Sequence, residues 1–184
     1  MTLMRQSLLL FITSLSFYFC SAQIEVAHIS VKEFKETGFG SFLNFALPVS
    51  DANYLTLEGG LQYFENSDNE SVGIFPVLIG YRYTINHSGT GFYVEPNAGY
   101  SFGETTIGVY DEVGSPMTDD NGKYLYEKVN GLTAGIGLGY LFEPSGGIQF
   151  NIGLRYERSF GNTATNLFAF RIAHAFTFGR RQKD

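Results

Sequence analysis

The segment that most constrains the fold is the last apolar stretch of the chain, residues 166–178. Every second position holds a large apolar side chain or a histidine: Phe168, Phe170, Ile172, His174, Phe176 and Phe178. The positions between them are mostly small or polar: Leu167, Ala169, Arg171, Ala173, Ala175 and Thr177. Such a period of two predicts an extended strand with two chemically different faces. One strand of this kind fits a water-soluble sandwich or a membrane barrel, so the rest of the chain must decide.

The composition favours a barrel that crosses a membrane. The chain has 184 residues, with 18 Phe, 12 Tyr, 22 Gly and no Trp. A membrane helix needs about 18 or more consecutive apolar residues, and no such run follows the N-terminal segment. A transmembrane barrel places every second residue in its lumen, so its mean hydropathy stays close to zero although its wall is apolar. Because no repeat of solenoid length is present, one domain is expected.

Residues 1–22 are expected to be an export signal peptide. Arg5 supplies the positive end, an apolar run follows, and the small residues Cys20 and Ala22 precede the expected cleavage before Gln23. In an alternative, Cys20 is a lipoprotein acylation site, but the bulky residues 17–19 disfavour it. The chain has a single cysteine, which excludes an intramolecular disulfide.

The exported chain is acidic. One of the 12 basic residues lies in the signal segment, so 11 basic side chains face 18 acidic ones, for a formal net charge of −7. Binding to phosphates requires a basic patch, so nucleic acid is not an expected partner.

Eight segments of the mature chain show strand periodicity and are separated by polar turns. They are 24–32, 38–49, 54–64, 73–85, 91–102, 128–142, 148–160 and 166–178. The first is the weakest, and we expect His28 and Ser30 to face inward there. Pro76 cannot donate a ladder hydrogen bond, so irregular pairing is expected at that point. Eight is an even number, which lets the sheet close so that no strand edge meets lipid.

The pattern resembles small outer-membrane β-barrels of the OmpA/OmpX type over nearly all of residues 23–178. This resemblance implies an all-β fold, an eight-stranded antiparallel up-and-down transmembrane β-barrel, in the outer membrane of a Gram-negative bacterium. It also implies outer-membrane lipids and the barrel assembly machinery as partners. Such barrels end in alternating aromatics that the machinery reads, and Phe176 and Phe178 match this assembly signal. A short basic tail, residues 179–184, follows the signal and is expected in the periplasm.

Loop lengths orient the expected barrel. The connections at 50–53, 86–90 and 143–147 are short, whereas 65–72 and 103–127 on the opposite side are long. The other two connections on that side, 33–37 and 161–165, are not long, so the asymmetry is partial and is carried by two loops. Outer-membrane barrels have short periplasmic turns and longer external loops, so both termini are expected in the periplasm.

The longest connection, residues 103–127, is the expected site of a surface partner. Its β-prone ends at 105–111 and 123–127 predict a hairpin that protrudes from the membrane. Residues 118–123 resemble part of a calcium loop, but they lack the alternating acids and the terminal Glu of that motif. Asn121-Gly122 is therefore interpreted as a turn, and no metal or cofactor is expected.

Six charged residues are expected to face the lumen: Glu58, Arg82, Glu95, Arg155, Glu157 and Arg171. An unpaired charge away from water is costly, so opposite signs in one narrow interior should pair. A barrel of eight strands is only wide enough for its side chains to fill. We therefore interpret this lumen charge cluster as a structural plug, in preference to a proton or ion relay.

No catalytic residue is assigned from the sequence. His174 is expected to face lipid, and lipid A deacylases of similar fold use a lipid-facing Ser-His-Glu set, but no outward Glu is available at its depth here. A neutral histidine hydrogen-bonded to a neighbouring strand is the favoured interpretation. The favoured function is a non-enzymatic envelope or surface-contact role. A passive channel, a lipid-modifying enzyme and a soluble ligand carrier are the alternatives.

Overall fold

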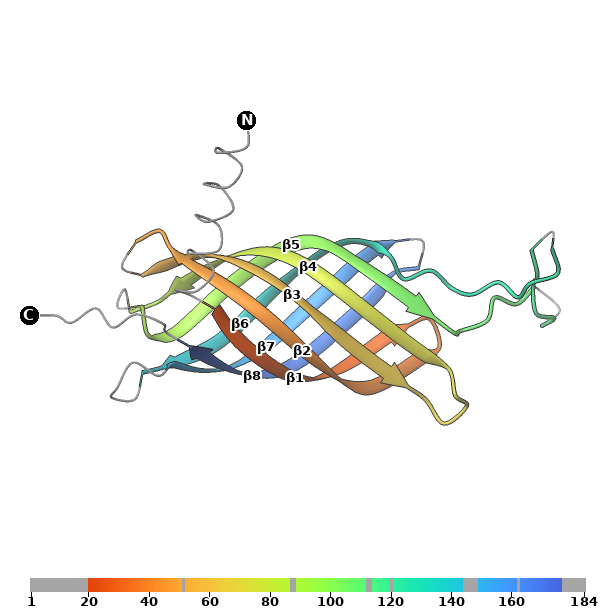
Figure 1. Ribbon diagram of the computed structural model, residues 1–184, viewed down its shortest axis with the longest axis horizontal. Helices are drawn as coiled ribbons and strands as arrows, with labels where there is room; N and C mark the ends of the chain where they lie inside the picture. The colour runs from red at the N-terminus through yellow and green to blue at the C-terminus, as the bar shows by residue number, and fades with distance from the viewer. Residues whose placement is uncertain are drawn as a thin grey trace, which may run out of the picture.

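The computed structural model describes residues 20–176 apart from 51, 87–88, 112–113, 120, 144–148 and 162. Its strands are β1 (Cys20–Val31), β2 (Phe34–Pro48), β3 (Asn53–Glu65), β4 (Ser71–Thr84), β5 (Gly91–Thr105), β6 (Gly131–Phe142), β7 (Gln149–Gly161) and β8 (Thr165–Phe176). Each strand pairs antiparallel with the next and β8 pairs with β1, so the sheet is a closed barrel (Figure 1). This confirms the predicted fold class. Among the described residues no helix has the length and apolarity to cross a membrane.

Each predicted segment corresponds to one strand, and the differences lie at the ends. β2 begins four residues earlier than predicted, and β6 begins three residues later. β1 starts at Cys20, so the last three residues of the expected signal peptide pair with β2 and β8. Cleavage before Gln23 stays a prediction, and it would shorten β1 by these three residues. Phe176 is the last residue of β8, and Phe178 lies outside the described residues.

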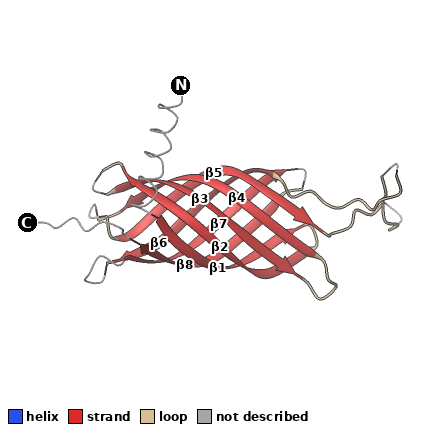
Figure 2. Ribbon diagram, in the orientation of Figure 1, coloured by secondary structure: helices blue, strands red, loops and turns tan. Residues whose placement is uncertain are grey.

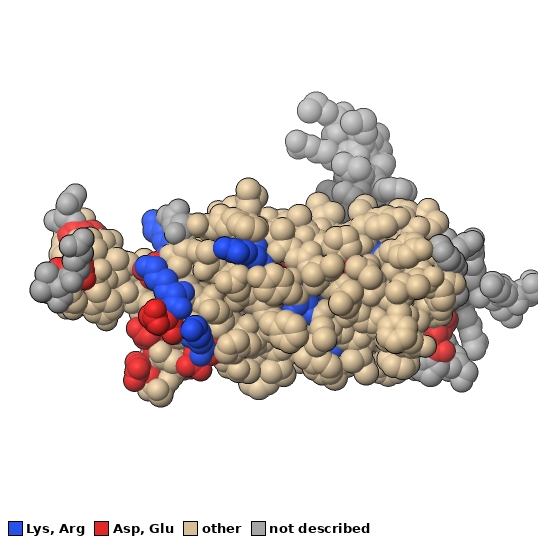
Figure 3. Space-filling model, turned by 180° about the vertical axis from the view of Figure 1, so that it is seen from behind, with Lys and Arg blue, Asp and Glu red and all other residues tan. Residues whose placement is uncertain are grey.

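The outer wall of the barrel is apolar because side chains alternate across each strand. Ile24, Phe39 and Leu132 leave 68%, 70% and 67% of their surface exposed. Charged side chains are sparse on the wall and gather at the end where the β5–β6 connection leaves, here called the loop end (Figure 3). The opposite end holds the start of β1 and the end of β8 and is called the termini end. Such exposure of large apolar residues suits a lipid environment.

The lumen has two layers of different polarity. Toward the loop end it is filled by an apolar cluster, here called the apolar plug: Ala27, Ile29, Val31, Phe34, Phe64, Val72, Ile74, Val129, Leu167 and Ala169, with Ile107 against them. Toward the middle and the termini end it is polar and charged. Regular structure among the described residues is strand throughout (Figure 2).

Pro76 interrupts the sheet as predicted. The β3–β4 pairing stops after Gly59–Val77 and resumes at Gln62–Ile74 in the same register. On its other side Pro76 keeps its place opposite Ser101 of β5. The missing N–H therefore removes pairing locally without shifting the strands.

Candidate functional site

The lumen holds a network of buried ion pairs centred on Arg155. All six predicted charged residues lie inside the barrel and are buried. The Arg155 guanidinium donates to Glu58, and its Nη2 lies 2.9 Å from Glu25 Oε2. Its Nη1 also lies 3.2 Å from Glu157 Oε1. One guanidinium thus faces three carboxylates from β1, β3 and β7.

The other two arginines complete the network. Arg171 Nη1 donates to Glu58 Oε2 at 2.8 Å. Arg82 Nε donates to Glu95 Oε2 at 2.6 Å, and the Arg82 guanidinium lies over the Tyr93 ring. These contacts join β3, β4, β5, β7 and β8 across the lumen, which is the geometry of a plug.

The glycines of β6 make room for this network. A Cβ at Gly137 would lie 2.9 Å from Arg171 Nη2, closer than real side chains approach. A Cβ at Gly139 would lie 2.6 Å from the Tyr93 hydroxyl oxygen. The inward glycines therefore let bulky polar side chains from other strands lie against the β6 backbone.

Glu25 belongs to the network but was not predicted from the sequence. Along β1 the apolar residues change faces: Ile24 and Val26 point outward, whereas Ala27 and Ile29 point into the lumen. This switch occurs because the lumen is charged near Glu25 but apolar toward the loop end. Gln23 and Glu25 are polar and alternate with the apolar Ile24, and this alternation could have placed both polar residues inside the barrel.

The apolar plug closes the lumen above the charged network. Phe64, Ile29 and Val72 are fully buried, and Val129 and Ile107 from the β5–β6 connection pack against the same cluster. Apolar side chains at this depth exclude water from the path between the two ends. The described interior is therefore a filled core.

The β5–β6 connection, residues 106–130, extends well beyond the barrel and is here called the extension (Figure 1). Its base is a two-stranded stem, in which Glu127 N donates to Ile107 O and Val109 N donates to Leu125 O. Above the stem, Met117 N donates to Val109 O at 2.8 Å and Leu125 N donates to Met117 O at 2.9 Å. These bonds form a three-way junction from which two short lobes diverge, residues 109–117 and 117–125.

Each lobe is closed by an aspartate and a glycine. Asp111 Oδ1 accepts from Ser115 N at 2.8 Å, and Asp119 Oδ1 accepts from Lys123 N at 2.9 Å. Gly114 and Gly122 have φ of 82° and 76°, values that favour glycine. The acids thus stabilise turns, and among the described residues no group of His, Cys, Asp or Glu is arranged to hold a metal ion.

The extension differs from the predicted single hairpin. The regular ladder ends at Thr105 and begins again at Gly131, and the described residues between them form isolated bridges in place of a continuous ladder. The lobes leave several side chains exposed, Tyr110, Met117, Tyr124 and Leu125, and the adjacent Tyr126 of the stem is exposed as well. An aromatic head therefore projects into solvent on a narrow stem.

A polar latch ties the stem to the rim of the barrel. Glu127 contacts Lys32 in the β1–β2 turn, and its Oε2 accepts from Thr163 Oγ1 at 2.6 Å. On the other side of the stem, Ser71 N donates to Thr106 Oγ1 at 2.7 Å. These contacts fix the direction in which the extension leaves.

The latch should weaken in acid. Burial raises the pKa of Glu127, but the hydrogen bonds from Lys32 and Thr163 and the Lys32 charge outweigh it, so the net pKa lies below its usual value. A carboxyl whose pKa is lower in the folded state stabilises the fold above its unfolded pKa of about 4.3, and loses that effect as pH falls through the folded pKa. We expect proteolysis of the extension to accelerate in that acidic range. The extension of the Glu127→Gln variant should be cleaved faster than that of wild type at neutral pH, and its cleavage rate should depend less on acid. Equal pH profiles of cleavage for variant and wild type would contradict the latch.

The solved structures similar to this fold include small bacterial outer-membrane barrels. The attachment invasion locus protein (Ail) of Yersinia pestis superposes with a TM-score of 0.58 at 14% identity, over 86% of this chain and 97% of that one. Neisserial surface protein A (NspA) superposes with a TM-score of 0.56 at 11% identity, over 87% of this chain and 96% of that one. No family model matches the chain, and no curated relative does. The chain has the fold of the small outer-membrane β-barrels.

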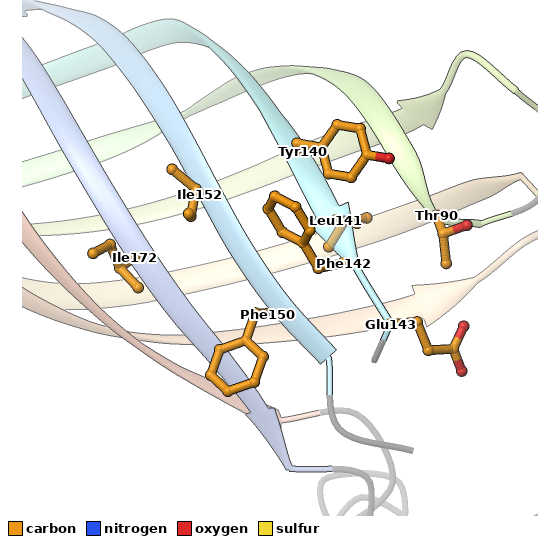
Figure 4. A pocket seen from close by; sticks show the side chains of 8 residues that line it. All are labelled: Thr90, Tyr140, Leu141, Phe142, Glu143, Phe150, Ile152 and Ile172. Atoms are coloured by element: carbon orange, nitrogen blue, oxygen red, sulfur yellow. The ribbon is translucent and has the colours of Figure 1, made fainter. Parts of the chain in front are cut away.

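The fold explains why the outer wall of the barrel is apolar. The apolar outer face is the face that such proteins turn toward lipid. A shallow groove near the termini end is lined mainly by apolar side chains such as Tyr140, Phe150 and Ile152 (Figure 4). Lipid acyl chains suit such a groove, and its polar lining residues Thr90 and Glu143 lie at one side of it.

Among the described residues, His174 and His28 lie on the outer wall of the barrel. His174 faces outward as predicted, and its ring stands edge-on to Phe150 at 4.9 Å between centroids. The inward placement predicted for His28 and Ser30 is wrong, because both lie on the outer face of β1. His28 Nδ1 is 3.2 Å from Thr37 Oγ1. The reason is the change of faces along β1, which puts the apolar residues of its loop-end half inside.

Proposed function

We propose that this protein is a non-enzymatic outer-membrane barrel that contacts another macromolecule through its extension outside the cell. The three-way junction of the extension carries the proposal, because it holds an exposed aromatic head in one shape. Rigid tyrosines supply large contact area at low entropic cost. The buried charges and the apolar plug occupy the lumen among the described residues, which disfavours a passive channel.

The loop end is proposed to face the cell exterior. At the termini end the two longest connections run over residues 85–90 and 143–148, whereas the much longer connection 106–130 leaves at the loop end. External loops of such barrels are longer than their periplasmic turns. This orientation puts both termini in the periplasm, where the assembly machinery would meet Phe176 and Phe178.

The partner is proposed to be neutral or cationic at its contact surface. The lobes carry Asp111 and Asp119 beside a single described cation, Lys123. One Ail structure contains the heparin analogue sucrose octasulfate. The acidic lobes of this chain would repel such a polyanion, so a protein surface fits better here.

Photo-crosslinking on intact cells tests the proposal. A photoreactive phenylalanine analogue would replace Tyr110 or Tyr124 on the lobes, with Tyr81 on the lipid-facing wall as the matched control. We expect discrete protein adducts from the two lobe positions and lipid adducts from the wall position. Absence of any discrete adduct at both lobe positions would contradict the proposal.

Protease treatment of the same cells tests the orientation. External protease should cut within 106–130 and spare the turns at 85–90 and 143–148. Cleavage restricted to those two turns would reverse the proposed topology.

A lipid-modifying enzyme is a second candidate because His28 and Ser30 share the lipid-facing side of β1. A serine nucleophile needs a base that a third group orients. The described contact of the His28 ring is with Thr37, where a carboxylate would be required. Lipid analysis of vesicles containing wild type or Ser30→Ala decides between the candidates: a released fatty acid that disappears in the variant would establish the enzyme.

A further inference from the structure

The buried charges of the lumen do not balance. Seven charged residues are buried in the described barrel: four carboxylates, Glu25, Glu58, Glu95 and Glu157, and three guanidiniums, Arg82, Arg155 and Arg171. The interior therefore carries one excess negative charge if every group is ionised. An uncompensated charge in a narrow, water-poor interior is costly.

The excess charge lies at Glu157. Glu25, Glu58 and Glu95 each accept hydrogen bonds from arginine. Glu157 Oε1 is buried without a hydrogen bond, and its 3.2 Å approach to Arg155 Nη1 is shared with the bond from Nη1 to Glu58. The charges acting on Glu157 are Arg155 of its own strand, Glu58 of β3, Glu25 of β1 and Arg171 of β8.

Another oxygen without a hydrogen bond, Asn97 Oδ1, lies close to the Glu157 side chain. Asn97 of β5 and Glu157 of β7 flank Gly135, and a Cβ there would lie 2.8 Å from Asn97 Oδ1 and 2.7 Å from Glu157 Cγ. Asn97 Oδ1 is buried without a hydrogen bond. Two hydroxyl oxygens are also buried without a hydrogen bond: Ser159 Oγ, two residues further along the inner face of β7, and Thr165 Oγ1, on the residue opposite Ser159 in β8.

We propose that the lumen binds one small cation, a proton or Na⁺, between Glu157 and Asn97. Either cation neutralises the excess charge and gives both orphaned oxygens a partner. A protonated Glu157 donates to the Asn97 amide oxygen, and Na⁺ takes carboxylate, amide and hydroxyl oxygens as ligands. The site would make the barrel's stability depend on the cation content of its surroundings.

Urea unfolding of the barrel in lipid vesicles tests this site. Wild type and Glu157→Gln would be compared in alkaline N-methylglucamine chloride, a medium poor in protons and small cations. There the variant should unfold at a urea midpoint equal to or above that of wild type, because glutamine removes the charge and keeps the shape. Glu58→Gln is the control, and its midpoint should fall in every medium.

Two further measurements distinguish Na⁺ binding from proton binding. Replacing N-methylglucamine with Na⁺ at constant pH and ionic strength should raise the wild-type midpoint if Na⁺ binds. Lowering the pH to neutral without Na⁺ should raise it if a proton binds. In both cases the midpoint of Glu157→Gln should stay unchanged. A loss of stability in Glu157→Gln as large as in Glu58→Gln, or an equal response of variant and wild type, would overturn the proposal.

Discussion

Replacing Arg155 with alanine should lower the free energy of unfolding by roughly 3–5 kcal/mol, the usual cost of removing one partner from a buried ion network. Arg155 is the cation shared by Glu25, Glu58 and Glu157. Its removal leaves Arg171 as the nearest compensation for three buried carboxylates, and the Phe42 ring loses the guanidinium that covers it. The loss should be largest at alkaline pH, where none of the carboxylates gains a proton.

Reversible urea unfolding in lipid vesicles measures this loss. Arg158→Ala is the matched control, because Arg158 lies on the same strand three residues along, faces outward and is exposed. We expect that control to change the free energy of unfolding by less than about 0.5 kcal/mol. Similar stabilities for the two variants would mean that the lumen network does not hold the barrel together.

Purified wild-type protein should give no stable conductance steps in planar bilayers. A conducting path would have to pass both the ion pairs around Arg155 and the apolar plug around Phe64, and these layers block it by different means. Long-lived, reproducible steps of a single size would contradict the filled interior. A matched preparation of the Phe64→Gly variant indicates which layer matters more, since appearance of conductance there would assign the barrier to the apolar plug.

Much of the barrel was predictable because its alternation is chemically clear. In β4, β7 and β8 one face is formed mainly by large apolar residues, and each arginine lies on the other face, so Arg82, Arg155 and Arg171 could be placed inside. In β1 the rule fails, since the lumen itself changes from charged to apolar along the strand. The alternation of Ala27 and Ile29 with His28 then indicates the wrong face.

The extension was predictable in length and in its stem, but not in its shape. Its three-way junction depends on single hydrogen bonds among Val109, Met117 and Leu125, and residues 115–119 have little strand propensity. The contact of Lys32 with Glu127 joins residues that are 95 positions apart. Such contacts form because closure of the barrel places distant connections side by side at its rim. No local sequence pattern predicts them.

Amide hydrogen exchange at the three-way junction tests the central claim, that a closed barrel presents an ordered head outside the membrane. The amides of Met117 and Leu125 donate within the junction, and that of Val109 joins it to the stem. In vesicle-embedded protein these three amides should exchange more slowly than the amide of Ser67, an exposed residue of the β3–β4 connection. The difference should be at least about tenfold, which corresponds to about 1.4 kcal/mol of local stability. Exchange at the rate of an unstructured peptide would show that the head has no fixed shape and would contradict the account.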